Sequence, residues 1–487
     1  MADGILSAMR RFALALLLTA ACSQAQPPSY DLAINNGRVI DPESGLDAIR
    51  HIGVRGGKIT AISATPLRAG RLIDAKGHVV SPGFIDLHSH GIDNASNEYQ
   101  AHDGVTTALE LEAGLPAIQA YLDSRQGKAI LNHGATVSHT ALRVAAMKKN
   151  AGAPITNSVA AVAQPGRNDR LEDEEEFSRL AYLMEQGLQQ GGLGVGALPA
   201  YVPGATRAEF YRVYQMAARW GVPVYSHVRG RGEEGVQEAI ANAAGSGASV
   251  HIVHLNSSSR GAIPLMLDMI AGARKRGIDV TTEAYPYTAG STFIESAIFD
   301  EGWQQSMQIS YGDLQWQATG ERLTKETFEK YRKVGGIVIQ HSMRPEWIKL
   351  AMSSPFVIVA SDTMPYAKGA HPRGGGTFSK VLGEYVREMK VTSLTEALRR
   401  MTLLPAQRLE PIAPGMKNKG RLKVGADADI TVFDPATVKD TGTYQTGPQF
   451  SQGIPYVIVN GVLVVDQGKT VPNAFPGQAI RGNYQPK

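Results

Sequence analysis

The sequence predicts an α/β protein that consists of a TIM-type (β/α)8 barrel and a small β-sandwich domain built from both ends of the chain. Strand-like and helical runs alternate through the middle of the 487 residues, a pattern typical of parallel βα units. Short strands separated by turns occupy residues 28–82 and return in residues 411–487. The barrel is therefore expected over residues 83–410, with a long insertion at about 285–355 before its last strand.

Residues 1–25 are expected to be an export signal. Met9 is followed by two arginines, about ten apolar residues and then small residues, which is the usual order in a signal peptide. Such a run is too short to span a bilayer, which needs roughly 20 residues. Cleavage after Ala25 and lipid attachment at Cys22 both fit, so we expect an exported protein, either periplasmic or lipid-anchored to a bacterial membrane. Cys22 is the only cysteine, so no thiol chemistry is expected in the mature chain.

The composition excludes several classes of protein. Hydrophobic residues make up 43% and charged residues 19% of the chain, so a globular protein with ample core is expected. The net charge is only +4 and no dense basic run is present, which argues against a nucleic-acid partner. The stretch GRGEEG at 230–235 fits the glycine pattern of dinucleotide sites, but Glu233 and Glu234 would repel a pyrophosphate.

Polar side chains stand where the expected barrel strands end. In a TIM barrel the carboxyl ends of the strands form the active site. In the stretch SPGFIDLHSHG, His88 and His90 occupy alternate positions and therefore share one face of the strand. The eight strands are expected to end near His90, Glu112, Ser138, Leu198, His227, His254, Glu283 and Asp362.

One mouth of the barrel would thus receive four imidazoles and two carboxylates. This donor set suits one or two divalent transition-metal ions, with zinc as the default. His251 is three residues before His254 on the sixth strand, so it is expected to face outward. His102, His133 and His341 are expected to be structural. The expected donors and their neighbouring carboxylate are His88, His90, Glu112, His227, His254 and Asp362.

The motifs DLHSHG, GVTTALELEAG, PVYSHVRG, VHIVHLN, AYPYTAGST and HPRGGGTF resemble the amidohydrolase superfamily. Within it, the chain is similar to the N-acyl-D-amino-acid deacylase (D-aminoacylase) branch from about residue 30 to the end. The resemblance implies a metal-dependent amide hydrolase that acts on a small-molecule substrate. A water activated by the metal would attack the amide, releasing a carboxylate and a D-amino acid.

The resemblance also assigns roles to single residues. It gives His227 and His254 to the tighter metal position and His88 and His90 to a second, often weakly occupied one. Asp362 matches the aspartate that acts first as general base and then as general acid.

Substrate-binding roles follow from the same resemblance. Arg373 matches an arginine that clamps the substrate α-carboxylate, for which a planar, two-pronged donor is well suited. Tyr287 is the preferred carboxylate-binding tyrosine, with Tyr285 as the alternative. The other residues expected to contact the substrate are Asn256, His139 and Tyr201.

Two positions depart from the deacylase pattern. The deacylases usually carry a metal-bridging cysteine at the end of the second strand, whereas this chain has Glu112 one residue earlier. We prefer Glu112 to Glu110 as the bridge because it is nearer the strand end. The lysine that bridges in other amidohydrolases is absent from GGLGVGALPA on the fourth strand. Asn256 stands where the deacylases tend to have a carboxylate-binding lysine, which leaves the substrate open.

Two alternatives remain. A D-aminopeptidase or a cyclic amidase of the same superfamily would use the same metal site on another amide. An exported binding protein could use the barrel as a metal-dependent ligand trap, but trapping needs no proton shuttle, so Asp362 argues against it.

Overall fold

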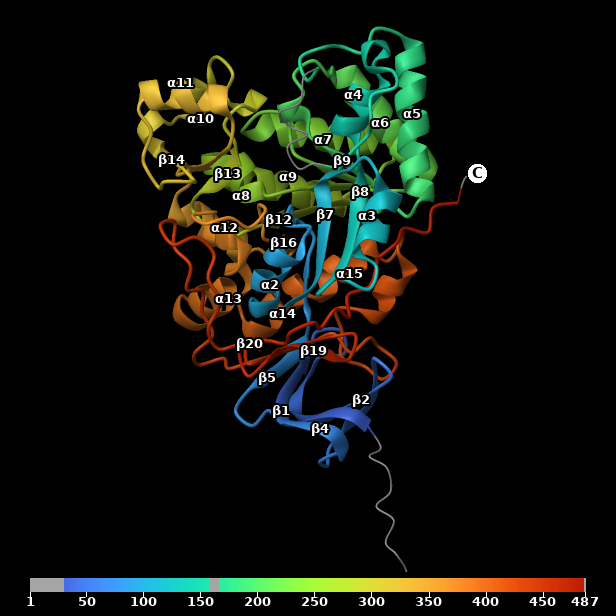
Figure 1. The fold of residues 1–487 in the computed structure, drawn as a ribbon, viewed down its shortest axis with the longest axis vertical. Coiled ribbons are helices and arrows are strands. Elements are labelled where there is room, and N and C mark those ends of the chain that lie inside the picture. Colours follow the sequence, from blue (N-terminus) through green and yellow to red (C-terminus); the bar gives the residue numbers. More distant parts are fainter. Residues whose placement is uncertain (1–29, 158–165, 486–487) are drawn as a thin grey trace, which may run out of the picture.

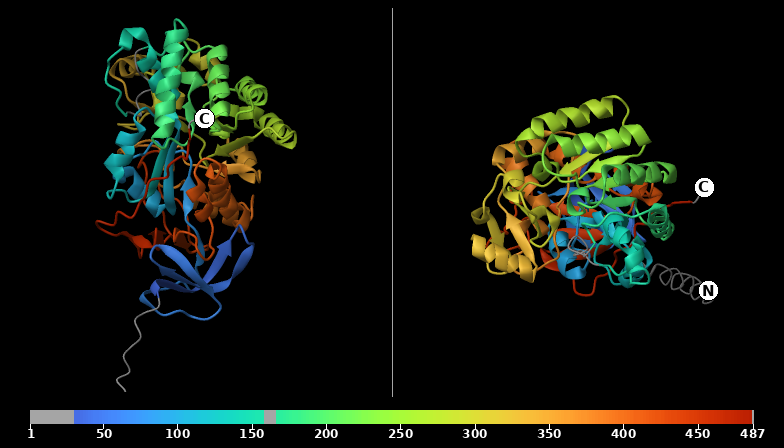
Figure 2. Two further views of the ribbon diagram at one scale, coloured as in Figure 1. Left: turned by 90° about the vertical axis from the view of Figure 1, so that its right-hand side faces the viewer. Right: turned by 90° about the horizontal axis from the view of Figure 1, so that it is seen from above.

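The computed structural model describes residues 30–157 and 166–485 and confirms the predicted barrel. Eight parallel strands form its sheet in the order β16-β12-β11-β10-β9-β8-β7-β6, with the helices packed around them (Figures 1 and 2). These strands are β6 (Phe84–Asp86), β7 (Val105–Leu115), β8 (Asn132–Ser138), β9 (Val195–Ala197), β10 (Val224–Ser226), β11 (Val250–Ile252), β12 (Val280–Ala284) and β16 (Val357–Val359).

Helices connect successive strands of the barrel, as expected for parallel βα units. Between β6 and β12 they are α2 (Asn94–His102), α3 (Ile118–Arg125), α4 (His139–Ala146), α5 (Glu174–Gln189), α6 (Arg207–Trp220), α7 (Glu233–Ser246), α8 (Leu255–Ser259) and α9 (Ile263–Lys275). Around β16 they are α12 (Pro345–Ser353), α13 (Thr377–Lys380), a π-helical segment (Val381–Glu388), α14 (Leu394–Met401) and α15 (Leu403–Leu409).

The barrel closes through the segments that follow β6 and β16, the two ends of the strand order. Asp86 accepts a hydrogen bond from the backbone N–H of Ser361 at 3.0 Å. Ser89 and Thr363 form a parallel bridge, and the N–H of His90 donates to the carbonyl of Thr363 at 2.7 Å. This seam brings the last strand against the histidine pair of the first.

Both ends of the chain contribute to one mixed sheet below the barrel, as predicted (Figure 1). The final described residues leave this sheet and run along the barrel, where His133 bridges Ala479. The predicted segment 411–487 is therefore divided between the sheet and the barrel. The strands are β1 (Tyr30–Asp41), β2 (Leu46–Arg55), β3 (Lys58–Ser63), β4 (Ala69–Asp74), β5 (Val79–Pro82), β17 (Ile430–Phe433), β18 (Tyr456–Val459), β19 (Val462–Asp466) and β20 (Lys469–Thr470).

The insertion between β12 and β16 folds as a unit beside the barrel (Figure 1). Three antiparallel strands in the order β13-β15-β14 form its sheet. A separate apolar cluster that includes Phe299, Trp303, Trp316 and Phe328 forms its core. The elements are β13 (Gly290–Phe293), α10 (Trp303–Met307), β14 (Leu314–Trp316), α11 (Lys325–Val334) and β15 (Ile337–Gln340).

The expected export signal and Cys22 lie outside the described residues and stay predictions. Among the described residues, none of the helices combines the length and apolarity that a membrane crossing requires.

A buried polar junction joins the sheet to the barrel. Lys419, 5% exposed, places Nζ 2.7 Å from Asp429 Oδ2 and 2.9 Å from Asp427 Oδ2. Asp429 also accepts hydrogen bonds from the side chain of Asn132 at the start of β8 (3.0 Å) and from the N–H of Asn460 after β18 (2.7 Å). Removing the lysine would leave two carboxylates close together without their shared cation.

Lys419→Met is expected to lower the free energy of unfolding by about 3–5 kcal/mol, because an uncompensated buried charge remains. Urea unfolding measures this loss.

Burial lowers the pKa of Lys419, but Asp429 and Asp427 raise it more, so the pKa lies above the ordinary value of 10.5. The stabilisation is therefore fully present below pH 10.5 and is lost as the pH rises through the folded-state pKa.

Lys325→Met, which breaks an exposed pair with Glu329 at 4.0 Å, is the control. It should cost less than about 1 kcal/mol. Equal losses in the two variants would contradict the role given to the junction.

Candidate metal centre and active-site cavity

A cavity opens at the carboxyl ends of the barrel strands, where the polar residues were predicted to meet. The barrel supplies most of its wall, and the insertion supplies the rest through β13 and the end of β15. The lining residues include His90, Glu112, Tyr201, His227, Arg231, His254, Tyr285, Ser291, Phe293, Gln340 and Asp362.

A bulge in β7 aims Glu112 into this cavity. The pairing of β7 with β8 shifts between Glu110 and Leu115, and a bulge of this kind re-aims side chains next to active sites. Glu110 supports the bulge, because its Oε1 accepts a hydrogen bond from the N–H of Ala113 at 3.1 Å. Strand β9, on the far side of β8, approaches so closely that a Cβ on Gly196 would lie 2.5 Å from the Glu112 carbonyl oxygen.

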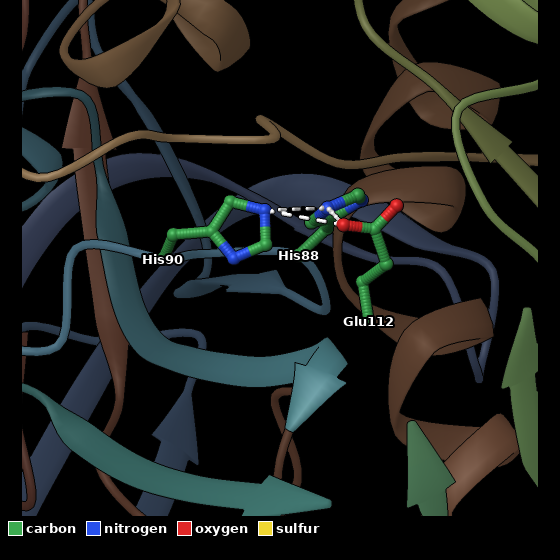
Figure 3. Close-up of side chains that lie close together, drawn as sticks. All are labelled: His88, His90 and Glu112. Carbon is green, nitrogen blue, oxygen red and sulfur yellow. Dashed lines mark hydrogen bonds and ion pairs between the residues drawn. The ribbon is translucent and has the colours of Figure 1, made fainter. Parts of the chain in front are cut away.

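The carboxylate of Glu112 lies between two histidine pairs. Its Oε1 is 2.8 Å from His227 Nδ1 and 2.8 Å from His254 Nε2. Its Oε2 is 3.2 Å from His88 Nε2 and 3.3 Å from His90 Nε2, and Figure 3 shows this second group. Each pair together with Glu112 forms a group of three donors close enough to hold one metal ion.

Carboxylates behind the histidines fix the orientation of the first pair. Glu283 Oε1 is 2.5 Å from His88 Nδ1 and its Oε2 is 3.0 Å from His251 Nε2. Glu110 Oε2 is 2.6 Å from His90 Nδ1. These contacts hold each ring by the nitrogen that faces away from Glu112, so the other nitrogen is directed at the donor cluster.

The expectation that His251 faces outward is wrong. His251 is fully buried and turns toward Glu283, beneath the donor cluster. Strand β11 ends at Ile252, and His254 lies beyond it with a φ of 32°. The alternation of strand faces therefore does not apply between positions 251 and 254.

Burial and charge divide the cluster into ionised and neutral groups. Burial lowers the pKa of His88, but the charges of Asp362, Glu112 and Glu283 outweigh it and raise that pKa well above its ordinary value. Burial raises the pKa of Glu112, but the histidines lower it further, well below its ordinary value. Burial, followed by the charge of His254, lowers the pKa of His227 to about 4. The carboxylate is thus ionised and His227 is neutral, the forms in which each can bind a metal.

Asp362 stands beside the donor cluster, paired with Arg373. Its Oδ1 lies 2.9 Å from Arg373 Nη2, 3.5 Å from His88 Nε2 and 3.6 Å from His90 Nε2. Asp362 has a φ of 56°, a conformation that Asp and His adopt more readily than most side chains. The positive φ lies within the seam, between Ser361 and Thr363, and turns the carboxylate toward the histidines.

Two tyrosines border the cavity. Tyr201 donates or accepts a hydrogen bond with Thr292 at 2.8 Å, and Tyr285 lies under the guanidinium of Arg373, 4.7 Å from its ring centroid. Tyr287, the preferred tyrosine, instead donates to Asp440 at 3.2 Å and is absent from the cavity wall. Tyr285, kept as the alternative, is therefore the tyrosine of this pair that faces the cavity.

His139 and Asn256 also lie away from the cavity wall. His139 packs between α4 and α6, with its Nε2 3.1 Å from Glu209 Oε1. Asn256 hydrogen-bonds the backbone of Tyr285, donating to its carbonyl at 3.2 Å. In the described chain both side chains therefore contact other parts of the protein, and their expected role in substrate binding stays a prediction.

Sequence reasoning missed the roles of two residues. The sequence predicts a strand end near Glu283 but assigns this residue no function. An acidic residue in a buried strand nevertheless indicates a buried charged partner. Arg231 lines the cavity from the GRGEEG stretch, which was considered only as a dinucleotide site.

The fold and these residues define a TIM-barrel protein with a candidate metal centre at the carboxyl ends of its strands. The model of the amidohydrolase family matches residues 71–465, and the chain belongs to this family.

Known proteins similar to the chain include several deacylases. N-acyl-D-glutamate deacylase of Alcaligenes xylosoxydans xylosoxydans is 29% identical, over 93% of this chain and 96% of the relative. D-aminoacylase of the same organism is 28% identical, over 94% and 98%. A solved N-acyl-D-glutamate deacylase from Bordetella bronchiseptica, complexed with zinc and a phosphonate inhibitor, has a TM-score of 0.78 and 26% identity, over 93% of this chain and 99% of that one.

Glu283→Gln is expected to weaken zinc binding about 10- to 100-fold, because His88 loses the carboxylate that orients it. Competition with a chromophoric chelator measures the affinity. Glu209→Gln is the matched control, since this carboxylate also contacts a buried histidine but lies outside the donor cluster. Unchanged zinc affinity in Glu283→Gln would show that Glu283 does not support the site.

Proposed function

We propose that the protein is a zinc-dependent amide hydrolase that removes the acyl group from N-acyl-D-amino acids. The observation that carries this proposal is the ionised carboxylate of Glu112 between two histidine pairs, with Asp362 beside them. Family membership and similarity to deacylases along nearly the whole chain support the choice of reaction.

The donor set fits zinc by its chemistry. Imidazole nitrogens and a carboxylate are ordinary zinc ligands, and a catalytic zinc site keeps a position open. His227, His254 and Glu112 would hold one ion, and His88, His90 and Glu112 a second. When bound, zinc polarises the amide carbonyl and lowers the pKa of water toward about 7.

Asp362 moves the proton in the proposed reaction. Burial raises its pKa, but the charges of Arg373 and His88 lower it below its ordinary value, so the carboxylate is ionised at neutral pH. It can accept the proton of the attacking water and pass it to the departing nitrogen. The new C–O bond forms first, the C–N bond breaks once the nitrogen has received the proton, and the products are a carboxylate and an amino acid.

Tyr285 in the cavity wall and Arg373, which lies behind it against the Tyr285 ring and is not part of the wall, would supply donors for the substrate α-carboxylate. Arg373 is 1% exposed, and its Nε and Nη1 have no hydrogen-bond partner in the described chain. The hydroxyl of Tyr285 likewise lacks a partner there. A bound carboxylate would satisfy these buried donors, which are otherwise costly to leave unpaired.

Hydrolysis of a cyclic amide is the second candidate function. Asn256 favours it, because this residue contacts backbone and adds no positive charge where the deacylases tend to have a lysine. A cyclic amide without a carboxylate would not need that charge.

The purified protein with zinc is expected to release amine from N-acetyl-D-amino acids and not from their L-enantiomers, and a chelator should abolish the release. An amine assay over a panel of both series tests this. Release from cyclic amides alone would replace the proposed substrate class with the second candidate.

Asp362→Asn should reduce kcat about 10²- to 10⁴-fold, the usual contribution of general acid–base catalysis. Its zinc content, measured by elemental analysis, should match that of the unaltered protein. Asp440→Asn, which alters a half-buried carboxylate away from the cavity, is the control. Full activity in Asp362→Asn would exclude this aspartate as the proton carrier.

A further inference from the structure

A second cavity adjoins the active-site cavity on the side of the β10–α7 loop. It encloses about 300 Å³. We call it the side cavity; its wall includes Pro203, His227, Arg229, Arg231, Ser257 and Met307. His227, Arg231 and Ser257 line both cavities, so a molecule bound at the metal centre could extend from one into the other.

Positive charge gathers around the side cavity. Arg229 and Arg231 line it, and Arg260 lies against its wall, donating from Nη1 to the carbonyl of Ser306 at 3.3 Å. Glu238 lies 3.1 Å from Arg229. Arg231 and Arg260 form no ion pair with any acidic side chain of the described residues. Three guanidinium groups and one carboxylate leave two positive charges without a counterion from the described chain.

The contacts of these arginines leave donors free. Arg231 is held by the carbonyl of Ser257 at 2.8 Å and by Gln340 Oε1 at 3.0 Å, both neutral acceptors. Arg260 is 9% exposed, and its Nε and Nη2 have no partner in the described chain. The same is true of Nη2 of Arg229. Buried cationic donors without partners are costly, and an anion in the side cavity would lower that cost.

Arg231 and Arg260 also act on each other. Burial and then the charge of Arg231 lower the pKa of Arg260 to about 10. Two guanidinium groups that repel each other in this way bind an anion more strongly than either would alone, because the anion relieves their repulsion.

We infer that the side cavity binds a second carboxylate of the substrate, remote from the scissile amide, and that Arg231 is its principal donor. This inference rests on the proposed deacylase function and narrows its substrates to dicarboxylates. The first carboxylate contacts Arg373 and Tyr285, and the second reaches past His227 to Arg231. The second carboxylate can belong to the amino-acid side chain or to a dicarboxylic acyl group.

Steady-state kinetics with matched substrates tests the inference. N-acetyl-D-glutamate carries the second carboxylate on the side chain, and N-succinyl-D-alanine carries it on the acyl group. N-acetyl-D-glutamine and N-acetyl-D-alanine lack it. The unaltered protein should prefer at least one dicarboxylate to both uncharged references, and the preferred one identifies the source of the carboxylate.

Arg231→Met is expected to lower kcat/KM for the preferred dicarboxylate about 10- to 100-fold, mainly through KM, because a charge-assisted hydrogen bond is lost. N-acetyl-D-alanine should be far less affected. Arg231→Lys should restore part of the preference, since it keeps the charge. Arg219→Met, an exposed arginine on α6, is the control for loss of a guanidinium group elsewhere.

Two results would overturn the inference. One is the absence of any preference for either dicarboxylate in the unaltered protein. The other is an equal loss for N-acetyl-D-alanine in Arg231→Met, which would place Arg231 at the α-carboxylate instead.

Failure of the proposed function itself has a different signature, namely no turnover of any acylated amino acid. In that case calorimetry with glutarate still tests the site. Binding that weakens about 10-fold or more in Arg231→Met supports the side cavity as a carboxylate site. No binding, or equal binding to both proteins, rules it out.

Discussion

One carboxylate shared between two histidine pairs is the contact on which the rest of the site depends. Glu112 can occupy this position only because β7 bulges, because Glu110 holds the bulge, and because Gly196 lets β9 approach. The buried charge is tolerable because imidazoles surround it on both sides. The local irregularity of a single strand thus determines where metal chemistry can take place.

The closure of the barrel supplies the proton carrier. Strands β6 and β16 meet through side-chain and loop contacts, with Asp86 holding the backbone of Ser361. Asp362 follows directly and therefore faces the first histidine pair. His88 and His90 and the proposed base come from opposite ends of the strand order, so the site is complete only when the whole barrel has closed.

Much of this arrangement could be predicted from the sequence, since strand ends and alternation leave clear periodic signals. The eight strands, the meeting of the histidines with Glu112 and Asp362, and the sheet formed by both chain ends all follow from such patterns. Periodicity does not extend past the strand ends. The inward position of His251, the choice between Tyr285 and Tyr287, and the contacts of His139 depend on loop geometry and on side chains from distant segments, which no local pattern encodes.

The insertion has its own sheet and its own apolar core, yet it forms one wall of the cavity. One part of the substrate-facing wall therefore packs separately from the metal chemistry of the barrel. Substitutions among residues of the insertion can reshape the ligand-facing wall while the barrel keeps its donors in place. A fold divided in this way allows new specificities to arise around one unchanged reaction centre, with little cost to folding.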